Sequence, residues 1–241
     1  MLREFRFEKH LLQLDLNSEA DESVFREVFL DTDYLILNDV IKAASHGILD
    51  IGGHIGLFSL YARGLNERAP ILAYEPESTN FAAFKEHVRL NSVAGVTLKN
   101  TAVAGSDGNA KLYVSADSHN HSLVQATAKT ATVSAVSMQT IVEKHLAKAG
   151  VDFCDLVKMD CEGAEFEILR SMTPELFKKI GVFYLEYHEY ADEPKEGEKG
   201  RIKGEDRNPR LLRDIFQKNG FKTKLTVSRH DKRFGFILAH R

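Results

Sequence analysis

The chain has 241 residues, 43% of them hydrophobic and 28% charged, and 32 Lys and Arg nearly balance 35 Asp and Glu at a net charge of −3. This length suits one large domain or two small ones, and it buries enough apolar surface to fold without disulfides or metal. The near-neutral charge argues against broad nucleic-acid binding. We expect no membrane span and a cytoplasmic protein, because the apolar runs are short and no signal peptide begins the sequence. Two cysteines, Cys154 and Cys161, fit a reducing compartment.

The first 45 residues are predicted to form a helical cover on the core. Val24, Phe25 and Val28 recur at helical spacing and would share one face of a helix. Such a face is more often used for packing than for binding. We therefore divide the chain into a cover, residues 1–45, and a main domain, residues 46–241.

From Gly47 onward, short apolar strands alternate with helical patterns. The predicted strands are 47–51, 71–74, 96–103, 111–114, 133–136, 155–159, 182–185, 222–227 and 234–239, and the predicted helices are 57–62, 78–91, 138–149, one from about 164, and 211–218. Asp107-Gly108 predicts a hairpin turn between two of the strands. Strands alternating with helices favour an α/β fold with a mostly parallel, doubly wound sheet, closed by a C-terminal pair of antiparallel strands.

Two polar segments are predicted as loops. Residues 115–132 are rich in Ala, Thr and Ser, and residues 189–208 contain twelve charged residues in twenty. The second segment follows the carboxyl end of a strand, where doubly wound sheets bind ligands. A solvated loop is the ordinary interpretation, and a mobile lid over the site is the sharper hypothesis.

A glycine-rich turn and a later acid predict a nucleoside site. The sequence DIGGHIG runs from Asp50 to Gly56, and its glycines Gly52 and Gly56 allow a tight turn and close approach to a ligand. Glu75 ends the next strand, where a carboxylate can accept both hydroxyls of a ribose. A tight structural turn with an unrelated surface carboxylate is the alternative interpretation.

The identity of the nucleoside depends on Asp50. A carboxylate before the glycines would repel the pyrophosphate that a dinucleotide places at the start of the helix. The same carboxylate could orient the ammonium of a methionine moiety, directly or through water. The residues therefore favour S-adenosylmethionine (SAM) as the cofactor over NAD.

Four motifs occur in the order seen in one family. They are DIGGHIG at 50–56, Tyr74-Glu75-Pro76 followed by Asn80-Phe81, KMDCEGAE at 158–165, and Glu186-Tyr187-His188. Over roughly residues 31–188 the chain resembles the FkbM-type methyltransferases, and the block at 160–165 is the most specific part. The resemblance implies a class I, Rossmann-like methyltransferase domain with a seven-stranded sheet. It implies SAM as cofactor and, as a rule, a hydroxyl acceptor on a small molecule or sugar.

Individual residues then receive expected roles. The predicted cofactor-binding residues are Asp50, Gly52, Gly53, His54, Gly56, Glu75, Pro76, Ala102 and Asp160. In this scheme the glycine loop and Asp50 hold the methionine half, Glu75 holds the ribose, and Ala102 lines the adenine. His54 stands where the general methyltransferase loop has a glycine, but the family tolerates a polar residue there.

The predicted catalytic residues are Asp160, Glu186 and His188. Asp160 ends a strand at the crevice edge, and the other two lie two positions apart on a strand, so their side chains point the same way. His188 could act as general base, because its ordinary pKa lies near neutrality. Alternatively, the three could hold a divalent ion such as Mg²⁺ that lowers the pKa of the acceptor hydroxyl. A hydrogen-bonded pair at the strand end is a third possibility.

The acids that follow Asp160 allow two explanations. Glu162 and Glu165 could contact the cofactor or the reacting groups, or they could stabilise the start of a helix through its dipole. Two other functions also remain open for the whole chain. One is an NAD-dependent oxidoreductase or epimerase, and the other is a non-catalytic, nucleoside-binding partner module.

Overall fold

Seven strands form the central sheet of the computed structural model, which describes residues 2–31, 33–114, 122–123, 129–188, 208–228 and 233–241. Their order across the sheet is β11 (Lys222–Val227), β12 (Phe234–His240), β10 (Ile180–His188), β9 (Cys154–Met159), β3 (Ile48–Ile51), β4 (Ile71–Tyr74) and β5 (Val96–Lys99). Strands β10, β9, β3, β4 and β5 run parallel, and β12 pairs antiparallel with both β10 and β11. The predicted mostly parallel sheet with its C-terminal antiparallel pair is confirmed.

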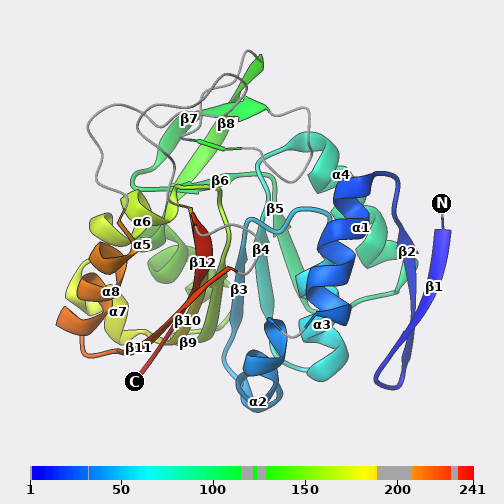
Figure 1. Cartoon of the computed structure of the whole chain (residues 1–241), viewed down its shortest axis with the longest axis horizontal. Coiled ribbons are helices and arrows are strands. Elements are labelled where there is room, and N and C mark those ends of the chain that lie inside the picture. Colours follow the sequence, from blue (N-terminus) through cyan, green and yellow to red (C-terminus); the bar gives the residue numbers. More distant parts are fainter. Residues whose placement is uncertain (1, 32, 115–121, 124–128, 189–207, 229–232) are drawn as a thin grey trace.

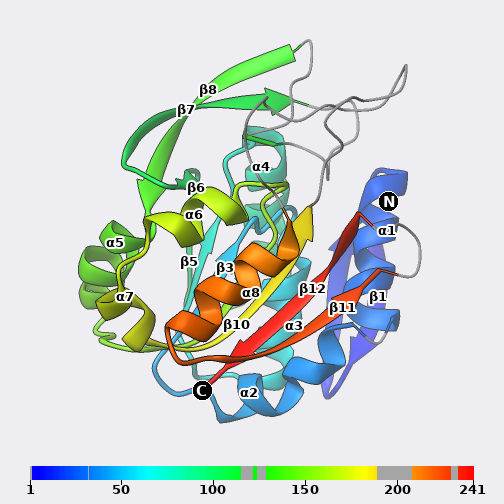
Figure 2. The ribbon, with the colours of Figure 1, turned by 60° about the vertical axis from the view of Figure 1, so that its left-hand side comes forward.

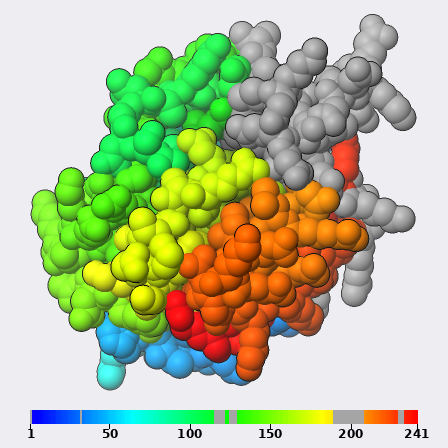
Figure 3. All heavy atoms as spheres, turned by 90° about the vertical axis from the view of Figure 1, so that its left-hand side faces the viewer, coloured from blue at the N-terminus to red at the C-terminus, as the bar shows by residue number. Residues whose placement is uncertain are grey.

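Helices cover both faces of this sheet (Figures 1 and 2). One face carries α2 (Asn38–Ala43), α3 (Leu57–Leu65) and α4 (Ser78–Leu90), and the other carries α5 (Met138–Thr140), η3 (Ile141–Leu146), α6 (Glu165–Ser171), α7 (Pro174–Lys178) and α8 (Pro209–Lys218). Figure 3 looks onto the second face, where the orange side chains of α8 form much of the outer surface. No helix in the described part of the chain is long and apolar enough to cross a membrane.

Alternation along the strands divides the interior into two cores. Leu49 and Ile51 pack into the core under α5–α8, whereas Ile48 and Ile71 pack into the core under α2 and α3. Successive side chains of a strand point to opposite faces, so a short all-apolar strand serves both cores at once. This explains why these strands appear in the sequence as continuous apolar runs.

A second, three-stranded sheet stands at the carboxyl edge of the first. It consists of β6 (Ala102–Ala104), β8 (Lys129–Ser137) and β7 (Gly108–Val114), in that order. The predicted strand 96–103 is therefore two strands in different sheets, because β5 ends at Lys99 and the side-chain amide of Asn100 donates to the carbonyls of Glu75 and Pro76. The predicted hairpin is wrong, since β7 pairs with β8 and not with β6. The predicted loop 115–132 is corrected at its end, where residues 129–132 belong to β8.

The N-terminal segment is only partly helical. It begins with a hairpin of β1 (Leu2–Phe7) and β2 (His10–Asp15), followed by α1 (Glu19–Phe25), the π-helical turn η1 (Arg26–Leu30) and the 3₁₀ turn η2 (Tyr34–Leu37). The helical cover predicted for residues 1–45 is thus wrong for residues 2–15. The hairpin docks on α4, where the amide of Asp15 donates to His87 Nε2 at 2.9 Å.

The remaining elements differ little from the sequence predictions. Helix α7 was not predicted, although Thr173 caps it and Pro174 occupies its first turn. The proposed lid, residues 189–208, lies outside the described residues except for Asn208, whose side chain caps α8. Residues 115–121 and 124–128 of the predicted polar loop also lie outside them.

Candidate active site

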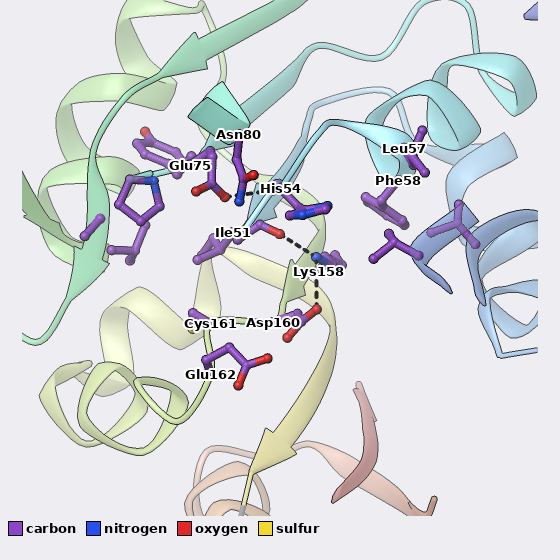
Figure 4. Close-up of a pocket in the computed structure, with 18 of the residues that line it drawn as sticks. Ile51, His54, Leu57, Phe58, Glu75, Asn80, Lys158, Asp160, Cys161 and Glu162 are labelled. Carbon is purple, nitrogen blue, oxygen red and sulfur yellow. Dashed lines mark hydrogen bonds and ion pairs between the residues drawn. The ribbon is translucent and has the colours of Figure 1, made fainter. Parts of the chain in front are cut away.

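A cavity opens at the carboxyl ends of β3, β4 and β9, beneath the three-stranded sheet. The space between its walls, including part that is open to solvent, measures about 840 Å³. Its lining residues are Val24, Glu27, Val28, Tyr34, Ile51, Gly52, Gly53, His54, Leu57, Phe58, Tyr74, Glu75, Pro76, Asn80, Ala102, Val103, Leu112, Leu123, Lys158, Asp160, Cys161 and Glu162. Figure 4 shows Glu75, His54, Lys158 and Asp160 around this space.

The glycine loop forms the floor of the cavity by crossing close to the loop after β9. Gly52 has a φ of +73°, and a Cβ at this position would lie 1.7 Å from the carbonyl oxygen of Asp160. The amides of Gly52 and Gly53 donate to the carbonyl of Tyr74, which ties the loop to the end of β4. Gly56, with a φ of +90°, starts α3 and packs against Phe84. Gly56 does not line the cavity in the described part of the chain, so its predicted cofactor contact gives way to a packing role.

Glu75 is the carboxylate at the end of β4 and is 5% exposed. Its Oε2 accepts the amide hydrogen of His54 at 2.8 Å, and its Oε1 accepts that of Glu77 at 2.8 Å. Burial raises the pKa of Glu75 to about 8, against the lowering effect of these two hydrogen bonds. Each carboxylate oxygen retains a second lone pair, so Glu75 can still accept hydrogen bonds from a ligand with adjacent hydroxyls.

Apolar side chains border the Glu75 end of the cavity. Pro76 follows Glu75 directly, and Ala102 and Val103 of β6 line the same space. Such a slot suits a flat apolar group attached to the sugar that Glu75 would bind. The predicted cofactor-binding residues Pro76 and Ala102 therefore line the same cavity as Glu75.

Asp50 lies behind the cavity wall. Its side chain is fully buried; Oδ2 accepts the hydroxyl hydrogen of Ser59 at 2.7 Å, and Oδ1 lies 3.7 Å from Lys158 Nζ. Burial raises the pKa of Asp50, although Lys158 acts in the opposite direction. Asp50 is absent from the cavity lining that the described residues form, so the structure gives it a supporting position and not the predicted place in the ligand space.

Lys158 connects the two loops that meet at Gly52. Its Nζ donates to the carbonyl of Gly52 at 2.8 Å and lies 3.8 Å from Asp160 Oδ2. Burial alone would lower the pKa of Lys158, but Asp160 and Asp50 raise it above its ordinary value. The ammonium is therefore charged at neutral pH, and it fixes Asp160 at the cavity edge. Sequence reasoning assigned no role to Lys158, although a lysine inside an apolar strand is an unusual residue to bury.

Asp160 and His188 come together, as predicted, but within a larger group of acids. His188 Nε2 lies 3.6 Å from Glu162 Oε1 and 4.0 Å from Asp160 Oδ1, and its Nδ1 lies 3.3 Å from Glu165 Oε1. Burial would lower the pKa of His188, but Glu162 and Glu165 raise it well above its ordinary value. The ring is therefore an imidazolium at neutral pH, which cannot accept a proton in that state.

The predicted base does not reach the cavity. As far as the described residues define the lining, it includes Asp160 but neither His188 nor Glu186. Glu186 is partly buried, and both burial and the charge of Asp160 raise its pKa well above its ordinary value. We therefore regard His188 as a residue that orients carboxylates, and Glu186 as a neighbour of Asp160 outside the cavity.

The ligand atoms near His188 show whether this site could hold a metal ion. One ligand atom each from Asp160, Glu165 and His188 lie within 4.8 Å of one another, and Glu165 Oε2 is buried without a hydrogen-bond partner among the described residues. The donor types suit Mg²⁺ or Mn²⁺. In this set Glu165 replaces Glu186, the residue predicted from the sequence. The ion would also have to displace the proton that the carboxylates hold on His188, so the metal stays a prediction.

The N-terminal segment supplies one wall of the cavity, which sequence reasoning missed. Val24, Val28 and Tyr34 line it beside Phe58, and Glu27 contributes a carboxyl group from η1. The helical spacing predicted that Val28 is buried, and it is. In the sequence, the feature that could have revealed this wall is Glu27, an acid next to the apolar face of that helix.

Known proteins resemble this chain in sequence and in fold. The family profile described as the FkbM methyltransferase domain matches residues 50–223. "Methyltransferase 1" of Beauveria bassiana is 28% identical over 173 residues, covering 64% of this chain and 68% of that protein. The methyltransferase domain of METTL16 superposes with a TM-score of 0.54 at 14% identity, over 95% of this chain and 73% of that one. A Streptococcus mutans protein described as a methyltransferase, solved with S-adenosylhomocysteine (SAH), superposes with a TM-score of 0.50 at 8% identity, over 88% of this chain and 99% of that one.

Proposed function

The chain belongs to the FkbM methyltransferase family, and from this premise we propose that it is a SAM-dependent O-methyltransferase. Its acceptor is a hydroxyl group on a small molecule or a sugar. Residues 46–241 form the methyltransferase domain and residues 1–45 its cover. The free thiols of Cys154 and Cys161 support action in the cytoplasm.

The position of Glu75 is the observation that carries this proposal. A buried carboxylate ends β4 beside the glycine loop, within a cavity whose adjoining wall is apolar. This combination provides an acceptor pair for ribose hydroxyls and a slot for a base, at the edge where doubly wound sheets bind ligands. Lys158 and Asp160 lie across the cavity from Glu75 (Figure 4), and the methionine half of SAM would extend to this end.

Methyl transfer then demands alignment and removal of one proton. SAM, when bound, would supply the methyl group: the acceptor hydroxyl would pass its proton to the Asp160 carboxylate, its oxygen would bond to the methyl carbon, and the carbon–sulfur bond would break with its electron pair going to sulfur. Asp160, fixed by Lys158, lies at this end and can accept the hydrogen bond and then the proton of the acceptor hydroxyl. His188 holds Glu162 and Glu165 in place as a cation.

Binding of SAM tests the proposal directly. Isothermal titration of the purified protein should show binding of SAM and of its product SAH, and much weaker binding of NAD. Glu75→Gln removes the charged acceptor for the ribose, and we expect it to weaken SAH binding at least about tenfold, the usual scale for losing a charge-assisted hydrogen bond. A protein that binds neither SAM nor SAH, or whose Glu75→Gln variant binds as wild type does, would overturn the assignment.

The two rival functions predict other results. An NAD-dependent oxidoreductase or epimerase would bind NAD in preference to SAH. A non-catalytic partner module would bind SAM and release no SAH with any member of a panel of phenols, alcohols and sugars.

A further inference from the structure

Glu27 is a carboxyl group in the cavity that the proposed reaction has not used. It lies on η1, in a segment whose other lining residues, Val24, Val28 and Tyr34, are apolar or aromatic. The charges of Asp160, on the loop after β9, and of Lys158, on β9, both act on Glu27. Two elements remote in sequence thus direct carboxyl groups into one space.

The ammonium group of Lys158 lines this space, but it already interacts with other groups. Lys158 Nζ donates to the Gly52 carbonyl and faces Asp50 at 3.7 Å and Asp160 at 3.8 Å. Among the described residues none forms an ion pair with Glu27, and Asp33 adds a further negative charge nearby. Burial and Asp160 raise the pKa of Glu27 to about 7, while Lys158 and the Tyr34 hydroxyl lower it less. The cavity therefore has an excess of negative charge at this end, and a bound cation would relieve it.

We propose that Glu27 and Asp160 together face the sulfonium of SAM, so that the protein binds the cationic methyl donor more tightly than the neutral thioether SAH. This inference rests on the proposed function and adds to it a residue that touches the donor. SAM and SAH share the adenosine, the ammonium and the carboxylate, and differ at the sulfur by one methyl group and one positive charge. Loss of that charge on transfer would weaken the hold on the product and favour its release.

The position of Glu27 explains why the sulfonium, and not the ribose, is its partner. In the proposed function, Glu75 and the glycine loop would hold the sugar end, and Pro76 and Ala102 would border the base. Glu27 shares its wall with Tyr34, whose ring lies 5.4 Å from that of Phe58, and Lys158 Nζ lies 6.0 Å from the Phe58 ring, so this wall faces the Lys158 end of the cavity. The aromatic side chains of Tyr34 and Phe58 line the same region and would add cation–π attraction for a sulfonium.

Titration of SAM and SAH into matched variants tests the inference without an identified acceptor. At pH 8, where Glu27 is mostly ionised, Glu27→Gln should weaken SAM binding about tenfold, because a charge-assisted contact in a partly buried site is lost. SAH binding should change by less than about twofold, since the neutral sulfur does not attract a carboxylate. Glu27→Asp keeps the charge and should retain part of the preference for SAM.

A control variant on the same segment distinguishes a direct contact between Glu27 and the donor from a long-range electrostatic effect. Glu19 is exposed on α1 and does not line the cavity, so Glu19→Gln removes the same charge and should leave both affinities unchanged. Equal weakening of SAM and SAH by Glu27→Gln would overturn the inference, because it would place Glu27 on a part that both ligands share. Unchanged affinities would overturn it as well, because Glu27 would then not face the donor. Failure of the wild-type protein to bind either ligand would instead overturn the proposed function.

Discussion

Glu75 illustrates how a single buried carboxyl group links ligand binding to pH. Burial raises its pKa to about 8 in the ligand-free protein, so at neutral pH the group is largely protonated. Two backbone amides already donate to its oxygens, and hydroxyl groups of a ribose would donate two more. Because such donors favour the charged form, ligand binding should lower the pKa of Glu75 and release a proton.

The sign of this linkage gives a testable pH dependence. SAH affinity should rise as pH increases from 6 towards 8, by up to about tenfold per pH unit, and then level off above the ligand-free pKa of about 8. Titrations across this range check it, with Glu75→Gln as the control that should show a flat profile. An equally steep profile in that variant would mean that another group takes up the proton.

His188 shows how neighbours can overturn an assignment made from a residue's ordinary pKa. Glu162 and Glu165 hold the imidazole in its charged form, which suits orientation of carboxylates and not proton abstraction. In this state the ring stabilises the folded protein most fully below pH 6.5, and the stabilisation fades as pH rises towards the raised pKa. The sequence identified His188, but it did not show that Glu162 and Glu165 lie around its ring.

A metal at Asp160, Glu165 and His188 would need that proton to leave. If Mn²⁺ binds there, its electron paramagnetic resonance signal should be quenched by the wild-type protein, and Glu165→Gln should abolish the effect because one of three donors is lost. Dialysis against EDTA should then lower methyl transfer, and Mg²⁺ should restore it. No quenching, with turnover unchanged by EDTA, would remove the metal hypothesis and leave the ion-paired imidazolium.

At the level of elements, the site depends on two loops that cross with almost no space between them. The loop after β3 passes so close to the loop after β9 that Gly52 has no room for a side chain. The amide of Asp160 also donates to the carbonyl of Ile51 at 3.0 Å. This crossing places Lys158 and Asp160 against the glycine loop, so the cofactor loop and the reacting end of the cavity form one unit.

Alanine substitutions at two glycines separate this close approach from backbone conformation. Gly52 and Gly150 have nearly equal φ values of +73° and +74°, but nothing lies within 4 Å of a Cβ on Gly150. Gly150→Ala should cost only about 1 to 2 kcal/mol of unfolding free energy, the cost of a left-handed conformation for alanine. Gly52→Ala should cost at least about 3 kcal/mol more and weaken SAH binding, because backbone must move. Urea unfolding of both variants measures this, and equal losses would contradict the proposed close approach.

At the level of the whole molecule, the N-terminal segment and the sheet share one hydrophobic core. Leu14, Leu37 and Ile41 are fully buried against Ile48 and its neighbours. The segment also supplies Glu27 and Tyr34 to the cavity. The boundary predicted at residue 45 therefore divides the chain in sequence, while the two parts pack as one body in space.

Removal of residues 1–45 should accordingly prevent cooperative folding. Large aliphatic side chains on β3 and α3 would be exposed, at about 1.5 to 3 kcal/mol each, and a few such losses exceed the usual net stability of a domain. Residues 46–241 alone should show no sharp thermal transition by near-ultraviolet circular dichroism and should bind a hydrophobic dye. A cooperative transition within a few degrees of the full chain would show that the cover is dispensable.

From residue 46 onward, the sequence alone determined most of the order of strands and helices and the motifs at their ends. Continuous apolar runs identify buried strands wherever they occur, and glycines with Glu75 and Asp160 mark the carboxyl edge, because these signals are local. Only the tertiary structure decided that Ala102 belongs to a second sheet, that Asp50 lies behind the cavity, and that Glu27 lies within it. Strand pairing, burial and the charges around His188 depend on residues far apart in the chain, and no local pattern records which of them meet.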